Sequence, residues 1–209
     1  MSICLRRREF IAELGGAAAW PLAAWADQCE RVRLLSLLMG LAENDLEAQA
    51  RAAALTQGLR GLGWTEGRNL RMDLRGGDGD ANRIRALAQE LVGLQPEIIV
   101  TSGTPATVAV QLETRTIPIV FGNMVDPVAT GIVPRLNQPG GNITGFANLE
   151  ASLFGKWPEL LSEIAPGLKR VVIMFNPQTA PASVYMPSLE TAARSLKIVP
   201  ITAPVYLFN

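Results

Sequence analysis

The chain has 209 residues, 48% of them apolar and 18% charged, so it can bury a sizeable core and is not expected to be disordered. Lysine plus arginine and aspartate plus glutamate are balanced at 19 each, which argues against a nucleic-acid groove or a polybasic membrane surface. The chain has no histidine, which excludes a Ser-His-Asp or Cys-His centre and a histidine-ligated zinc site. Small neutral or zwitterionic ligands fit this composition best.

The first 26 residues have the layout of an export signal. A basic start, RRREF, precedes a mildly apolar stretch rich in alanine and glycine, and the small residues at 24 and 26 predict cleavage before Asp27. The paired arginines, followed by an aromatic and an aliphatic residue, resemble a twin-arginine signal, with Sec export as the other route. We expect export by the twin-arginine or the Sec machinery and a periplasmic location.

Two other readings of this segment are less consistent with the sequence. A membrane anchor needs about 20 apolar residues, whereas Glu13, two glycines and Pro21 interrupt this stretch. A lipoprotein needs small apolar residues directly before its cysteine, and Cys29 lacks them. Cys4 lies in the leader, so we expect no intrachain disulfide in a soluble mature protein.

From residue 32 onward, the apolar periodicity alternates between strand and helix. Strands are expected at 32–40, 70–75, 96–103 and 117–122, and helices at 45–62, 82–94 and 105–113. Parallel strands need crossover connections, so this alternation predicts an α/β lobe whose parallel sheet is covered on both faces. We expect this first lobe to occupy residues 27–139.

A second unit of the same type begins after the segment DPVATGIVPRLNQPGGNITGF. In that segment, VATGIVPRL is expected to form a short helix against the first lobe, and PGGNITG to free the backbone for a crossing at residues 140–146. Beyond it, helices at 153–164 and 183–196 alternate with strands at 169–177 and 197–201. We expect a partial second lobe at 147–209, since domains usually run to about 100 residues or more.

The loops at the carboxyl ends of parallel strands are the expected place for a ligand. The loop TSGTPAT supplies the hydroxyls of Thr101, Ser102 and Thr104, while Gly103 allows close approach of the backbone. Pro105 suits the first position of the following helix, whose free amides could hold a carboxylate or phosphate. An ordinary strand-to-helix turn is the alternative. The turn after LLSLLMG is a further candidate.

The loop GNMVDP is another candidate wall, through Asn123 and Asp126. Asp126 suits either a ligand ammonium or the cap of the short helix expected to follow, and both readings stay open. A calcium loop is rejected at GGDGDANR, because Arg83 stands where the sharp-turn glycine belongs and Gln89 where the bidentate glutamate belongs. There is no P-loop lysine, dinucleotide fingerprint or paired carboxylate, so we expect no catalytic residues, no metal and no cofactor.

Taken together, these segments resemble a family of bacterial ABC-transporter substrate-binding proteins, whose relatives include tryptophan- and tyrosine-binding members. The likeness is carried by the leader and by four further stretches, GLRGLGWTEGRNL, IIVTSGTPAT, IPIVFGNMVDPVATGIVPRLNQPGGNITG and KWPELLSEIAPGLKRVVIMFNP. The resemblance implies two Rossmann-like lobes of the type I periplasmic-binding-protein class, with the second lobe incomplete in this chain.

The resemblance also implies which residues face the ligand. It places the ligand between the lobes, against the residues Thr101, Ser102, Gly103, Thr104, Asn123, Asp126 and Asn176. The hinge would consist of Gly140, Gly141, Asn142, Thr144 and Gly145.

The function expected from the resemblance is solute capture for an ABC importer. The protein would bind a small polar, amino-acid-like ligand, close around it and dock on the permease of the inner membrane, without catalysis. Two alternatives stay open, a non-functional truncated paralogue and an exported α/β sensor or enzyme domain. The second would need a nucleophile and a base that the sequence does not display.

Overall fold

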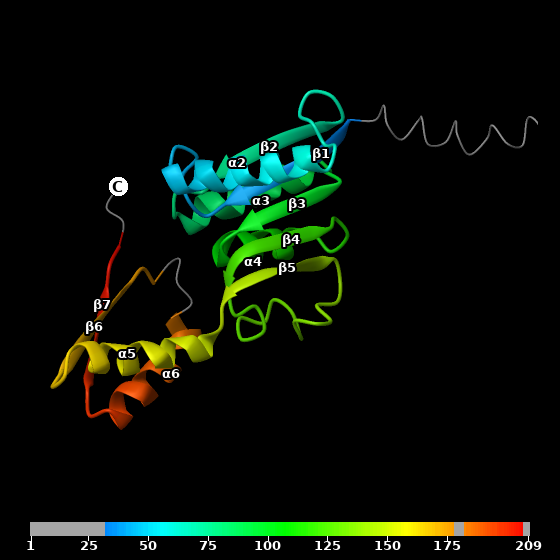
Figure 1. The fold of residues 1–209 in the computed structure, drawn as a ribbon. Coiled ribbons are helices and arrows are strands. Elements are labelled where there is room, and N and C mark those ends of the chain that lie inside the picture. Colours follow the sequence, from blue (N-terminus) through cyan, green and yellow to red (C-terminus); the bar gives the residue numbers. More distant parts are fainter. Residues whose placement is uncertain (1–31, 178–181, 207–209) are drawn as a thin grey trace, which may run out of the picture.

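The computed structural model describes residues 32–177 and 182–206, which form two α/β units (Figure 1). The leader, its cleavage site and both cysteines lie outside the described residues. The first unit is built on a parallel sheet of five strands in the order β2-β1-β3-β4-β5. The strands are β1 (Arg33–Met39), β2 (Leu70–Gly76), β3 (Ile98–Ser102), β4 (Ile119–Val125) and β5 (Ile143–Leu149).

The helices of this unit lie on both faces of its sheet, as the alternating pattern predicts. Helix α2 (Leu46–Gly61) covers one face, while α3 (Ala81–Gly93) and α4 (Thr104–Glu113) cover the other (Figure 1). Neighbouring residues of β1 point to opposite faces, so Leu37 packs in the core under α2 and Leu38 in the core under α3 and α4. The inner strand β1 is therefore buried on both sides of the sheet.

The structure corrects two expectations for the segment after β4. Residues 128–136 form turns instead of a short helix, because Gly131 has φ +75° and Pro134 follows three residues later. The segment still packs on the first unit, since Ile132 and Val133 are buried in the core beside α4. Residues 143–149 then form β5, a fifth parallel strand beside β4, where we expected a crossing.

The second unit contains the elements expected from the sequence, with its first helix divided in two. They are η1 (Ala151–Gly155), α5 (Lys156–Ile164), β6 (Arg170–Phe175), α6 (Ala182–Ser195) and β7 (Val199–Pro204). Strands β6 and β7 pair in parallel as a separate sheet. One face of this sheet is exposed, with Val172 and Met174 at 58% and 71% exposure, as expected for so small a unit.

Helix α3 begins at a carboxylate cap whose protonation we expect to affect stability. Asp80 accepts hydrogen bonds from the amides of Arg83 and Asn82, which lower the pKa of its carboxyl below the ordinary 3.8. A carboxyl group whose pKa is lower in the folded state than in the unfolded state stabilises the fold. This stabilisation is fully present above the unfolded-state pKa and is lost as the pH falls through the folded-state pKa.

The substitution Asp80→Asn tests this cap, since asparagine caps helices without titrating. We expect thermal unfolding, followed by circular dichroism from pH 7 to about pH 2, to show a smaller acid-induced loss of stability in the variant than in the native chain. Equal losses in the two proteins would show that the Asp80 cap does not contribute to acid sensitivity.

Candidate functional site

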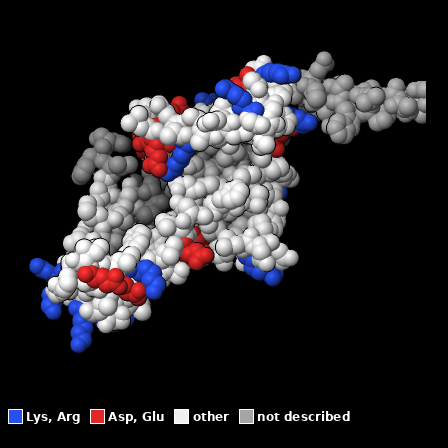
Figure 2. Space-filling view, viewed as in Figure 1, with Lys and Arg blue, Asp and Glu red and all other residues white. Residues whose placement is uncertain are grey.

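A cleft of about 670 Å³ lies between the two units and is lined by both. Its first wall consists of loops at the carboxyl ends of β1, β2, β3 and β4 together with the start of α2. Its second wall comes from η1, α5, the end of β6 and α6. Figure 2 shows the hollow between the units, with charged side chains gathered at its edge. Its size suits a small organic ligand.

Five of the residues predicted to contact a ligand line this cleft, namely Ser102, Gly103, Thr104, Asn123 and Asn176. The turn after β1, also a candidate, contributes Gly40, Leu41 and Ala42. The sequence pattern therefore identified loops that the fold brings to one edge, as expected for parallel strands. Their role in binding remains a prediction.

Two other predicted residues lie differently. Thr101 is fully buried, and its hydroxyl lies 2.9 Å from that of Thr107, which in turn donates to the Gly103 carbonyl. Asp126 is not among the cleft-lining residues, and its carboxylate accepts from the amide of Ala129 at 2.9 Å. Thr101 therefore stabilises the loop from within the core. The hydrogen bond from the Ala129 amide to Asp126 is accounted for by the capping interpretation of Asp126.

The loop after β3 presents the start of α4 to the cleft. Gly103 precedes the helix with φ +98°, a conformation that favours glycine, and Pro105 lies in its first turn. Among the residues that the structure describes, no side chain caps this helix end. The amides at such an end carry partial positive charge and suit an anionic group.

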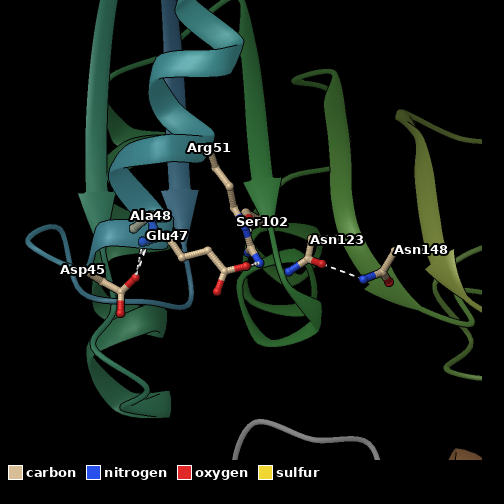
Figure 3. A network of polar contacts seen from close by, with 7 residues as sticks. All are labelled: Asp45, Glu47, Ala48, Arg51, Ser102, Asn123 and Asn148. Carbon is tan, nitrogen blue, oxygen red and sulfur yellow. Dashed lines mark hydrogen bonds and ion pairs between the residues drawn. The ribbon is translucent and has the colours of Figure 1, made fainter.

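The strongest polar feature of the first wall is a network that spans α2, β3, β4 and β5 (Figure 3). Arg51 reaches from α2, pairs with Glu47 and donates to the Ser102 hydroxyl at 3.1 Å. Asn123 lies between Arg51 and Asn148, whose Nδ2 is 2.6 Å from the Asn123 oxygen. We missed Glu47, Arg51 and Asn148; the available signal was an i,i+4 acid–base pair at the start of the helix that follows the first strand.

Asn123 owes its position to an irregularity in β4. The pairing of β4 with β5 shifts register between Phe121 and Met124, and Asn123 has φ +52°. A bulge of this kind redirects a side chain, and asparagine tolerates the left-handed region better than most residues. The irregularity places the Asn123 amide in the cleft.

The second wall is apolar and aromatic, which the sequence reading did not predict. Phe154 contacts Trp157 edge to face and stacks on Tyr185, with ring centroids 4.5 Å and 4.6 Å apart. All three line the cleft, together with Ile173 and Leu189. Burial raises the pKa of the Tyr185 phenol above its ordinary 10.0, so the hydroxyl remains protonated at neutral pH.

The predicted hinge residues belong to two different environments. Gly140 and Gly141 have positive φ in the turn before β5, and Asn142 donates to the Ile117 carbonyl at 2.7 Å. Thr144 and Gly145 lie inside β5, paired with β4. The chain leaves the first sheet only after Leu149, so any hinge motion in this connection has to act beyond β5.

Other kinds of site find no support within the described residues. Across 32–177 and 182–206, no group of three or more His, Cys, Asp or Glu side chains could hold a metal ion. Within the same residues, no helix has the length and apolar character needed to span a membrane.

Two α/β units that share a cleft at the carboxyl ends of their strands define the type I periplasmic-binding-protein class of fold. A family model described as ABC transporter substrate binding protein matches residues 44–206, and the chain belongs to this family. The resemblance inferred from the sequence is therefore confirmed. Members of this family are binding proteins, not enzymes, and the substrate-binding proteins of ABC importers act outside the cytoplasm.

Individual relatives agree with this assignment. The crystal structure of a conserved domain protein from Vibrio cholerae is 31% identical, with a TM-score of 0.76 over 84% of this chain and 58% of that chain. The structure of an ABC domain in complex with L-Trp from Streptococcus pneumonia, 18% identical, has a TM-score of 0.73 over 83% of this chain and 57% of that one, and shows the fold alone. A tyrosine-binding protein of Clostridioides difficile is 26% identical over 136 residues, which is 65% of this chain and 39% of that protein.

The chain spans less than two thirds of the length of each of these relatives.

Proposed function

We propose that this protein is the extracytoplasmic solute-binding component of an ABC importer and captures an amino acid with an aromatic or large apolar side chain between its two units. The observation that carries the proposal is the contrast between the walls of the cleft. Polar and cationic groups from Ser102, Thr104, Asn123 and Arg51 face an aromatic cluster on the other side. Such a cleft suits a ligand with a charged head and an apolar body.

Two relatives support the choice of ligand class. One is named as a tyrosine-binding protein, and the other was solved with L-Trp. The head of such a ligand would lie against the first wall and its ring against Trp157 or Tyr185. Contacts made only when both walls meet would stabilise the closed form, which the permease of the inner membrane would recognise. Cleavage before Asp27 would release the protein into the periplasm.

A thermal-shift screen of the purified chain tests the proposal. We expect L-tryptophan or L-tyrosine to raise the melting temperature, because a ligand that binds only the native state stabilises it by about 2.7 kcal/mol at 100 times its Kd. Glycine and glucose serve as controls that lack the ring or the charged head. If no amino acid shifts the transition, the proposed function is wrong.

A further inference from the structure

We infer that Arg51 is the carboxylate anchor of the cleft and that Asn123, held by Asn148, sets its selectivity for carboxylates. This inference rests on the proposed function and adds the group that is recognised and the residues that recognise it. The three side chains come from α2, β4 and β5, which lie apart in sequence and meet at the cleft (Figure 3). Arg51 and Asn123 line the cleft directly.

The Asn123 amide lies between the Arg51 guanidinium, which only donates, and the Asn148 amide, which can donate or accept. In one orientation its oxygen accepts from Asn148 Nδ2 at 2.6 Å. In the other it accepts from Arg51 Nη1 and Nη2 at 2.6 Å and 2.9 Å. In that second orientation the Asn123 NH₂ group lies 2.6 Å from the amide of Asn148, which can turn its own oxygen to accept the bond. The Asn123 oxygen is then the acceptor that Arg51 meets in the free cleft.

A ligand carboxylate can take the place of the Asn123 oxygen at Arg51. When its oxygens replace the Asn123 oxygen at Arg51, the amide can turn its own oxygen to Asn148 and present its NH₂ group to the ligand. The Ser102 hydroxyl accepts from Arg51 at 3.1 Å, so its proton remains available to donate. Guanidinium, amide and hydroxyl donors then converge on one anion, and a guanidinium matches a carboxylate with two parallel hydrogen bonds.

A simple surface ion pair between Arg51 and Glu47 does not account for this arrangement. Such pairs contribute little to stability, particularly when one partner is as exposed as Glu47 at 65%. It also gives no reason for the register shift of β4 that brings the Asn123 amide to Arg51 and Asn148.

Calorimetric titration with matched ligands tests the inference. L-tryptophan carries the carboxylate, L-tryptophanamide replaces it with a neutral amide, and tryptamine lacks it. We expect the native chain to bind L-tryptophan at least tenfold more tightly than L-tryptophanamide, in line with the strength of charge-assisted hydrogen bonds. In Arg51→Gln this ratio should fall to nearly 1.

Two further variants distinguish an effect on the position of the Arg51 guanidinium and the Asn123 amide from an effect on folding. Asn123→Asp keeps the size of the side chain but sets a permanent anion beside Arg51, so it should weaken L-tryptophan at least tenfold while changing tryptamine affinity far less. Asn148→Ala should lower the carboxylate-to-amide ratio severalfold and leave L-tryptophanamide affinity unchanged. Lys156→Gln is the control, because Lys156 forms an exposed i,i+3 pair with Glu159 and does not line the cleft.

The outcomes distinguish this inference from the proposed function. If L-tryptophan binds but Arg51→Gln keeps the native ratio, or Asn123→Asp binds L-tryptophan normally, the inference is wrong and the proposed function stands. If the native chain binds neither L-tryptophan, L-tyrosine nor a simple aromatic carboxylate such as indole-3-acetate, both are overturned.

Discussion

Replacing Gly145 by alanine is expected to destabilise the first unit by about 2–3 kcal/mol, the upper part of the range for overpacking a close contact. A Cβ atom at this position would lie 2.1 Å from the Phe121 carbonyl oxygen and 2.5 Å from Cγ of the Phe121 ring. Neither group can move away easily, because the oxygen belongs to the backbone of β4 and Phe121 is buried. The substitution has to separate β4 from β5 or displace the ring.

Urea unfolding of Gly145→Ala measures this loss, with Gly58→Ala as the matched control. Gly58 lies inside α2 and an added Cβ would meet nothing within 4 Å, so the control should gain about 0.5–1 kcal/mol. The pair also tests the hinge expected at residues 140–146. A Gly145→Ala variant with native stability but altered ligand affinity would favour the hinge role over close packing.

Phe154→Ala is expected to have the other large effect, a loss of about 3 kcal/mol, at the low end for removing a buried aromatic side chain. Phe154 is 6% exposed and contacts both Trp157 and Tyr185 in the small core of the second unit. Its removal should leave a cavity and release both rings from the cleft wall. Ligand affinity should therefore fall at least tenfold with stability.

The fluorescence of Trp157 reports unfolding of the second unit in a chain that begins at Asp27, and so lacks Trp20 and Trp25, and that carries Trp64→Phe. Phe146→Ala is the control, since Phe146 is 78% exposed on β5 and surface substitutions usually change stability by less than about 0.5 kcal/mol. Equal stability of the two variants would contradict the assignment of Phe154 to a packed core.

The order of strands and helices could be predicted because each carries its own periodicity. The strand β3, for example, is a short apolar run with a turn after it, and α3 places Ile84, Ala88 and Leu91 on one buried face. The strand β5 escaped prediction because it lies at the sheet edge and buries only Ile143 in its sequence ITGFANL. Such a segment has neither the alternation nor the apolar run of an inner strand.

The candidate site was predictable only where it depends on loops that follow strands. Ser102 and Thr104 come directly from that rule, whereas Asn123 was found only because the strand was expected to end at residue 122 and β4 in fact extends to Val125. Arg51 and Trp157 lie on helix surfaces, where a charged or aromatic residue looks the same in the sequence whether it faces solvent or a cleft. Asn148 becomes meaningful only once the shifted register of β4 and β5 brings it to Asn123.

The central claim is that the cleft between the two units binds an aromatic amino acid. Isothermal titration of the purified chain with L-tryptophan tests it most directly, because it measures the affinity and the number of sites without a reporter. We predict one saturable site that is lost in Phe154→Ala and retained in Phe146→Ala. Absence of saturable heat with both L-tryptophan and L-tyrosine, in a chain shown by circular dichroism to be folded, would contradict the claim.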